Sequence, residues 1–359
     1  MDGGLRATAR GFAASGRSDE ERLARGVSAL RRTVRVPSAT VQGAVATLVS
    51  RFFKIQHEEV RHMIRFAQKG MLILFASICF LVPAVVGAQG LDTAKLDQIL
   101  GRSGQKMGDV YRFGFPRTDL HVTLHGVAIK PGLALGTWAA FAGTDDDAMV
   151  MGDIVLLPDE VGSVMSKLRQ RGIEITALHN HLLGETPHVM YIHYMGHGKA
   201  GELAESFKAA LAESKTPMAK PAAPEASPEP AFVKAVEGTL AQKGKFNGGV
   251  LAFGVPRAEP ITMTPGGMTM PPSLGVAQSI NFQEAGPGKV ATTGDFVLIA
   301  EEVNPVVSAL EEHHIEVTGL HSHMLTEQPR IFFMHFWGYG PTQEVADGIK
   351  AALDKIHTK

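Results

Sequence analysis

Residues 178–193 read LHNHLLGETPHVMYIH, and residues 320–335 read LHSHMLTEQPRIFFMH. Both stretches contain His-x-His, then Glu, then Pro, then a third His. Each shared residue is offset by 142 positions (179 to 321, for example), with no insertion between them. The sequence therefore predicts a duplicated site built from histidine and glutamate.

The spacing within each stretch indicates a β-hairpin. His179 and His181 would share one face of a strand, because side chains at positions i and i+2 point the same way. The residues around Thr186 favour a turn, which would bring His193 roughly opposite His179 at about 5 Å. Three imidazoles would then converge in each hairpin, with the glutamate at the turn as a fourth ligand.

Imidazole nitrogens and carboxylate oxygens are common ligands of divalent transition metals. We expect zinc first, with copper or manganese as alternatives. The competing interpretation is that the histidines are structural and only form hydrogen bonds. The predicted metal ligands are His179, His181, His193 and Glu185 in the first stretch, and His321, His323, His335 and Glu327 in the second.

A metal site with an open position favours hydrolysis, because a coordinated water becomes acidic enough to react near neutral pH. Glu185 could then be a general base instead of a ligand, and His188 could carry protons. The alternative is a non-enzymatic module of the periplasm or cell envelope that binds a small ligand, copper or a wall component. Methionines such as Met190 and Met324 would suit copper, although methionine more often fills a core.

The length and composition of the chain restrict the number of domains, the partners and the metal ligands that can be expected. A chain of 359 residues allows two ordinary domains. Its formal net charge of −1 gives no electrostatic reason to expect nucleic acid as a partner. Cys79 is the only cysteine, so the chain cannot form an internal disulfide or a site with several cysteine ligands. The expected partner is instead a small molecule or a cell-envelope component.

The N-terminal residues resemble an export signal. Residues 71–86 carry no charge, follow Arg65 and Lys69, and lead into small residues ending at Ala88, as in a signal peptide. We expect residues 63–88 to be that signal, cleaved near Ala88, and residues 1–62 to be an over-called or disordered leader. The protein would then be periplasmic or secreted. It would contact the membrane only through the signal segment, if that segment stayed uncleaved.

The remaining chain divides into two repeats, residues 91–213 and 231–359. Residues 214–230 are rich in Pro, Ala and Glu and predict a solvated linker. Each repeat has strand-like alternation, an amphipathic segment and a closing helical segment. In repeat one we expect a helix at residues 93–100, a strand at residues 120–129 and a helix from Pro158 to about Arg171. We therefore predict an α+β fold of two tandem repeats, each an antiparallel sheet with a His-bearing β-hairpin and packed helices.

Other residues recur between the repeats. Asp153 and Asp295 each follow a glycine, and we expect them to mark a turn or a buried hydrogen bond. Arg117 and Arg257 are expected to pair with a local acid. Some repeat-one residues change in repeat two, including His188, which becomes Arg330. Either repeat one alone is the working site, or both repeats meet at one interface.

Four pieces of repeat one carry a family resemblance. They are FPRTDL at 115–120, GDIVL at 152–156, ALHNHLL at 177–183, and ETP at 185–187 followed by His193. With these motifs the chain resembles the LppY/LpqO-type bacterial family of domains of unknown function (DUF1259), in two tandem copies over roughly residues 91–359. The resemblance implies an exported bacterial protein and supplies no reaction. Lipid anchoring is not expected, because Ile78 precedes Cys79 where a lipobox has a small residue.

Overall fold

The computed structural model of the chain describes residues 90–219, 229–264 and 267–359. All of these residues belong to one compact unit, which runs to Lys359. The predicted leader, the predicted signal peptide and residues 220–228 of the predicted linker lie outside the described residues. Among the helices that are described, none is long and apolar enough to cross a membrane.

Repeat one forms a six-stranded antiparallel sheet in the order β1-β2-β5-β6-β8-β7. Short strands β3 and β4 make a separate ribbon. The elements are α2 (Thr93–Leu100), β1 (Gln105–Met107), β2 (Val110–Pro116), β3 (Thr123–Leu124), β4 (Val127–Ala128), α3 (Pro131–Ala134), β5 (Gly136–Gly143), β6 (Ala148–Leu156), α4 (Pro158–Gln170), β7 (Glu174–His179), β8 (Met190–Gly198) and α5 (Ala200–Leu211).

Repeat two has the corresponding sheet in the order β15-β17-β14-β13-β10-β9, and β12-β11-β16 form a small extra sheet. Its elements are α6 (Ala231–Leu240), β9 (Lys245–Asn247), β10 (Val250–Pro256), β11 (Ile261–Met263), β12 (Thr269–Met270), the 3-10 turn η1 (Pro272–Leu274), β13 (Ala277–Glu284), β14 (Lys289–Leu298), α7 (Ala300–Glu312), β15 (Glu316–His321), β16 (Glu327–Gln328), β17 (Phe332–Pro341) and α8 (Thr342–Leu353). The predicted α+β fold of two tandem repeats is confirmed.

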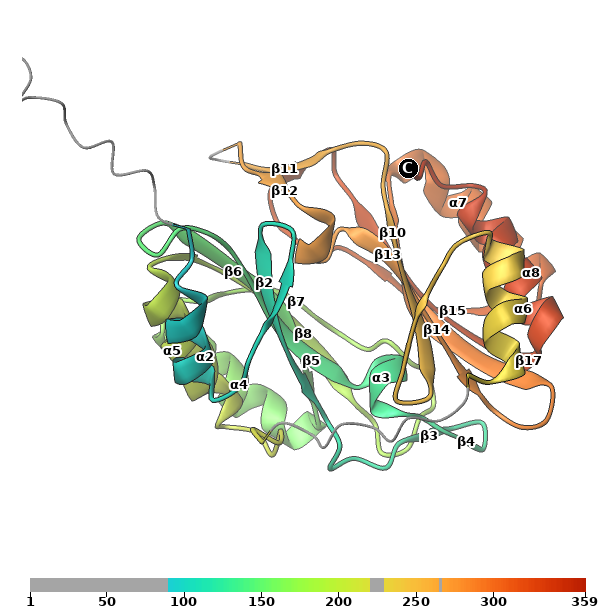
Figure 1. The fold of residues 1–359 in the computed structure, drawn as a ribbon, viewed down its shortest axis with the longest axis horizontal. Coiled ribbons are helices and arrows are strands. Elements are labelled where there is room, and N and C mark those ends of the chain that lie inside the picture. The colour runs from blue at the N-terminus through green and yellow to red at the C-terminus, as the bar shows by residue number, and fades with distance from the viewer. Residues whose placement is uncertain (1–89, 220–228, 265–266) are drawn as a thin grey trace, which may run out of the picture. The chain divides into compact units, whose positions relative to one another are not determined.

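Each sheet buries one face against its own helices. In repeat one, Leu96 of α2, Leu168 of α4 and Phe207 of α5 join a core with Phe141 and Ile192 of the sheet. An equivalent core lies under α6, α7 and α8. Figure 1 shows these two groups of helices on opposite outer sides, with the sheets between them.

The other face of each sheet is buried against the other repeat. Two apolar clusters combine residues of both repeats: Met151 with Val297 and Phe333 in one, and Leu133 with Trp337 in the other. Polar contacts cross the same boundary. The Gln283 side chain accepts from the Lys130 backbone N–H (2.9 Å) and donates to the Ala128 carbonyl (2.8 Å). The two repeats therefore bury surface against each other and are not independent domains joined only by a linker.

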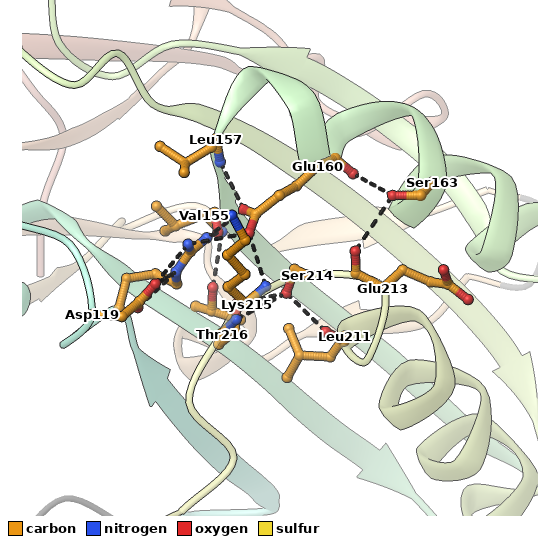
Figure 2. Close-up of polar contacts among 12 residues, drawn as sticks. Asp119, Val155, Leu157, Glu160, Ser163, Leu211, Glu213, Ser214, Lys215 and Thr216 are labelled. Atoms are coloured by element: carbon orange, nitrogen blue, oxygen red, sulfur yellow. Dashed lines mark hydrogen bonds and ion pairs between the residues drawn. The ribbon is translucent and has the colours of Figure 1, made fainter.

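A buried ion cluster fixes helix α4 to the sheet. Arg117 is fully buried, and its guanidinium donates to Glu160 (2.7 Å), Asp119 (2.9 Å) and the Val155 carbonyl (2.9 Å). The same carboxylate of Glu160 accepts from the Leu157 backbone N–H at the start of α4 (Figure 2). In repeat two, Arg257, Glu259 and Glu302 repeat this arrangement. The prediction that both arginines pair with local acids is confirmed.

Two local predictions differ from the structure. Residues 120–129 were expected to form one strand, but His125 and Gly126 have positive φ angles (49° and 81°) and split it into β3 and β4. The start of the predicted linker also contacts repeat one. The Lys215 backbone N–H donates to Glu160 (2.8 Å; Figure 2), and Arg102 donates to the Met218 carbonyl (2.7 Å). Residues 214–219 are thus held against the domain by hydrogen bonds.

Candidate metal centre

The three histidines of repeat one lie around the pairing of β7 with β8. His179 is the last residue of β7 and is opposite Tyr191, whereas His193 is opposite Ala177. His181 lies two residues beyond β7, in the loop before β8. This differs from the predicted geometry, in which His179 and His181 share a strand and His193 is opposite His179. The conformation of this loop, and not the alternation of side chains along a strand, brings His181 close to the other histidines.

Repeat two places its histidines in the same way. His321 ends β15 opposite Phe333, and His335 of β17 is opposite Gly319. His323 follows in the loop. The duplicated sequence pattern is therefore a duplicated local geometry.

The two histidine sets meet and form one cluster. His179 and His321, which are equivalent residues, have ring centroids 3.7 Å apart. His193 stacks on His323 at 3.5 Å, and the equivalent pair, His335 and His181, stacks at 3.9 Å. The third histidine of each repeat thus stacks on the loop histidine of the other repeat. This arrangement gives the cluster a local pseudo-twofold axis that passes between His179 and His321. Of the two interpretations from sequence, the geometry agrees with a joint site at one interface.

An aromatic ring supports the loop histidine of each repeat. His181 stacks on Tyr191 with ring centroids 3.5 Å apart, and His323 stacks on Phe333 at the same distance. Tyr191 is fully buried, and its hydroxyl donates to the Ala134 carbonyl (3.0 Å). Each loop imidazole thus lies between its own repeat's aromatic ring and the other repeat's third histidine.

Two aspartates complete the cluster, and sequence reasoning gave them no ligand role. Asp153 is opposite His193 in the β6–β8 pair, and Asp295 is opposite His335 in the β14–β17 pair. Asp153 Oδ2 lies 3.7 Å from His181 Nε2 and 3.8 Å from His193 Nε2. Asp295 contacts His335 Nδ1 directly. The sequence does contain a signal for this role, because Asp153 and Asp295 are separated by the same 142 positions as the equivalent histidines.

The hydrogen bonds of the cluster leave one nitrogen of each ring without a partner. Among the described residues, the Nε2 atoms of all six histidines are buried and have no hydrogen-bond partner. His179 and His321 contact backbone carbonyls through Nδ1 at 3.3 Å, and His335 does so at 3.2 Å. A carbonyl only accepts, so Nδ1 carries the proton in these three rings and the Nε2 lone pair is free.

Burial favours the neutral form of His179, His181, His193, His321 and His323. It lowers the pKa of His193 to about 3 and of His321 to about 4, and it lowers the pKa values of His181 and His323 well below the ordinary value. Neighbouring histidines add to the shift for His181, His321 and His323, since two adjacent rings resist carrying charge together. Neutral imidazole is the form that binds metals.

The two aspartates shift in opposite directions. Burial and the nearby Asp295 raise the pKa of Asp153 well above its ordinary value. Burial also disfavours the charged form of Asp295, but His335, His193 and His321 outweigh it and lower the pKa of that carboxyl. The pKa values of the two equivalent carboxyls are therefore shifted in opposite directions.

Three groups of ligand atoms in this cluster could hold a metal ion. Within each group the atoms lie within 4.8 Å of one another. Two of the groups draw on both repeats. The groups are His179 with His321, His323 and His335; His179 with His181 and His193; and His181 with Asp295 and His335.

The two glutamates predicted as ligands have other contacts. Glu185 accepts from the Val189 backbone N–H (3.0 Å) and contacts His188 Nδ1 (2.6 Å). Glu327 accepts from the Ile331 backbone N–H (3.2 Å) and from Arg330 (3.1 Å). Neither carboxylate belongs to a ligand group among the described residues. The predicted ligand roles of Glu185 and Glu327 therefore do not agree with this geometry; their contacts instead stabilise the loop between the two strands.

A cleft of about 650 Å³ opens onto the cluster. His181, His193 and His323 line it together with both aspartates. Residues of both sheets form its walls, including Arg112 and Trp138 from repeat one and Gln278 and Asn281 from repeat two. The candidate centre is thus accessible to a small molecule from one side.

Three methionines in or beside the two stretches, Met195, Met324 and Met334, pack in or against cores, whereas Met190 is half-buried. Met324 belongs to an apolar cluster shared by both repeats, with Met195 packed against it. Met334 lies in the core beneath the helices of repeat two. These positions agree with methionine as a core filler and give no support to copper binding through thioethers.

The profile of the family described as Domain of Unknown Function (DUF1259) matches residues 94–213 and 234–355. The chain belongs to this family. The two matches are the two repeats, so the expectation of tandem DUF1259 copies is confirmed. None of the curated proteins matches the chain. Among solved structures, a trimeric bacterial microcompartment shell protein, PduB, is similar at 10% identity over 70% of this chain and 89% of that one. Its TM-score of 0.17 is too low to support any argument.

Proposed function

We propose that this DUF1259 protein binds a divalent transition metal, zinc first, at the histidine–aspartate cluster. The observation that carries the proposal is the set of six buried Nε2 atoms without a hydrogen-bond partner among the described residues. Each buried polar atom left unpaired costs about 1–3 kcal/mol, so a purely structural role for all six is unfavourable. Coordination removes that cost.

Residues of both repeats would hold the metal. His179 takes part in two of the three ligand groups and therefore joins the repeats in one centre. Asp295 is the carboxylate of the third group and would add negative charge to an otherwise neutral ligand set. When bound, such an ion supplies a Lewis acid that polarises a carbonyl or phosphoryl oxygen.

We propose hydrolysis of a small molecule as the activity. The cleft has a volume within the usual range of about 300–1,000 Å³ for small-molecule sites. Asp153 lines it and is absent from the ligand groups. The positive charge of a bound metal would lower the raised pKa of Asp153, and the ionised carboxylate could then accept a proton from an attacking water. In this proposal Asp153 replaces Glu185 as the general base.

Metal analysis of the purified protein tests the proposal. The wild type and the His121→Ala control, which changes an exposed histidine, should retain the metal. The His179→Ala variant should lose most of it, because that ring joins two groups. Zinc added to the chelated wild type should raise its Tm. A wild type that takes up no metal, with the same Tm with and without zinc, would contradict the proposal and favour a metal-free binding module.

We propose that the protein is exported, to the periplasm or beyond. The support is the uncharged run at residues 71–86 with its preceding basic residues and small-residue exit. N-terminal sequencing of protein recovered outside the cytoplasm should begin near Gln89. A mature chain that retains residues before Met71 would contradict it.

A further inference from the structure

The cleft is lined by one arginine, Arg112 of β2, and one lysine, Lys245 of β9. On β2, Arg112 is opposite Gln105 and Ala140, and on the equivalent strand β10, Ala252 is opposite Lys245 and Asn281. Both residues line the cleft. One side therefore carries a guanidinium where the other has a methyl group.

Trp138 holds Arg112 in place. The guanidinium carbon lies 3.8 Å from the centre of the indole ring, a distance typical of cation–π contact. A side chain at Gly275 would come within 3.1 Å of the same ring, which indicates that the indole packs closely against the backbone of repeat two. Arg112 is thus positioned by both repeats.

The hydrogen-bonding capacity of Arg112 is largely unused. Its one side-chain hydrogen bond among the described residues is long, 3.4 Å, to the Ser273 carbonyl, and no described carboxylate forms an ion pair with it. Arg117 and Arg257, by contrast, each pair with two carboxylates. A guanidinium has five N–H donors, so most of those on Arg112 remain for a ligand in the cleft.

We propose that Arg112 binds the carboxylate or phosphate group of a small organic anion whose remainder extends toward His181, His193 and Asp153. Arginine suits both groups, because its planar fork donates two parallel hydrogen bonds to their oxygens. Ala252, at the equivalent position of repeat two, leaves space for this group, and Lys245, which also lines the cleft, adds positive charge that favours an anion. The description of this anion as a substrate rests on the proposed function; the binding of the anion does not.

Tryptophan fluorescence measures the binding directly. The chain has two tryptophans, Trp138 in the cleft and the buried Trp337. In a Trp337→Phe background, Trp138 is the reporter. Benzoate and phenyl phosphate are the anionic probes, and benzamide is the neutral analogue of benzoate. Each is titrated into the protein before and after chelation of metals.

Benzoate or phenyl phosphate should change the fluorescence saturably, with benzamide at least about tenfold weaker. Arg112→Met should weaken the anions by at least about tenfold and leave benzamide unchanged, and Arg112→Lys should restore part of the loss. Circular dichroism establishes that each variant is folded, and Lys243→Met serves as an exposed-cation control.

Equal binding of benzoate and benzamide, unchanged affinity in Arg112→Met, or no binding of either anion to the wild type would overturn the inference. The chelated samples separate it from the metal proposal. A protein that shows no affinity for metal and still binds the anions in a way that depends on Arg112 is one possible result. That result would support the anion site and contradict the proposed metal function.

Discussion

At the scale of single residues, the buried guanidinium–carboxylate clusters contribute to the stability of each repeat. Glu160 is almost fully buried and joins Arg117, the start of α4 and Lys215. Removal of one partner leaves a buried charge uncompensated, which costs about 3–5 kcal/mol. We expect Glu160→Ala to lower the free energy of unfolding by that order, and Glu302→Ala to act similarly. Glu202→Ala, at an exposed pair, should change it by less than about 0.5 kcal/mol; equal effects in urea denaturation would contradict this.

The histidines make the metal-free protein sensitive to acid. Burial lowers the folded-state pKa of His193 to about 3 and of His321 to about 4, whereas unfolded histidines titrate near 6.5. As pH falls from 7.5 toward 5, the unfolded chain therefore binds protons that the folded chain does not. The free energy of unfolding should fall by up to about 1.4 kcal/mol per pH unit for each such histidine.

Urea denaturation of the chelated protein at several pH values measures this slope. A His193→Ala/His321→Ala variant should show a shallower pH dependence than the wild type, and His121→Ala should not. Stability that is constant or rises on acidification would show that the rings are not buried in the neutral form.

At the scale of elements, the sequence was most informative where the structure is local. The predicted helix at residues 93–100 is α2, and the predicted helix starting at Pro158 is α4, because amphipathic spacing and a proline in the first turn act within one element. The position of His181 could not be predicted this way. It depends on the loop in which Glu185 accepts from Val189, and on stacking against His335 of the other repeat.

Two carboxylates distinguish the predicted site from the observed one. Asp295→Asn should weaken metal binding by about tenfold or more, since even the loss of a group that only hydrogen-bonds to a metal ligand weakens binding by about 10–100-fold. Glu185→Gln should leave the metal stoichiometry unchanged, because its carboxylate contacts the loop. Metal titration of both chelated variants tests this, and the reverse order of effects would restore the glutamate to the ligand set.

At the scale of the whole molecule, the site exists only where the repeats meet. Its histidines come equally from both, and apolar clusters such as that containing Met151, Val297 and Phe333 also combine them. Periodicity and spacing describe each repeat but carry no information on how two repeats face each other. That is why the sequence predicted the histidines and left open whether they form one site or two.

Cutting the chain between the repeats should leave them together. A protease site inserted within residues 220–228 separates the covalent halves without altering either sheet. After cleavage, the two fragments should co-elute in size-exclusion chromatography and retain the metal, because the shared apolar surface remains buried. Fragments that separate, each still carrying metal, would refute a shared interior.

Anomalous diffraction from crystals of the zinc-loaded protein tests the central claim most directly. The account predicts zinc density among the six histidines, with Nε2 atoms from both repeats about 2.0–2.1 Å from the ion. Two separate peaks, each ligated by a single repeat through Glu185 or Glu327, would contradict it. So would zinc density only on surface groups, with the six rings unoccupied.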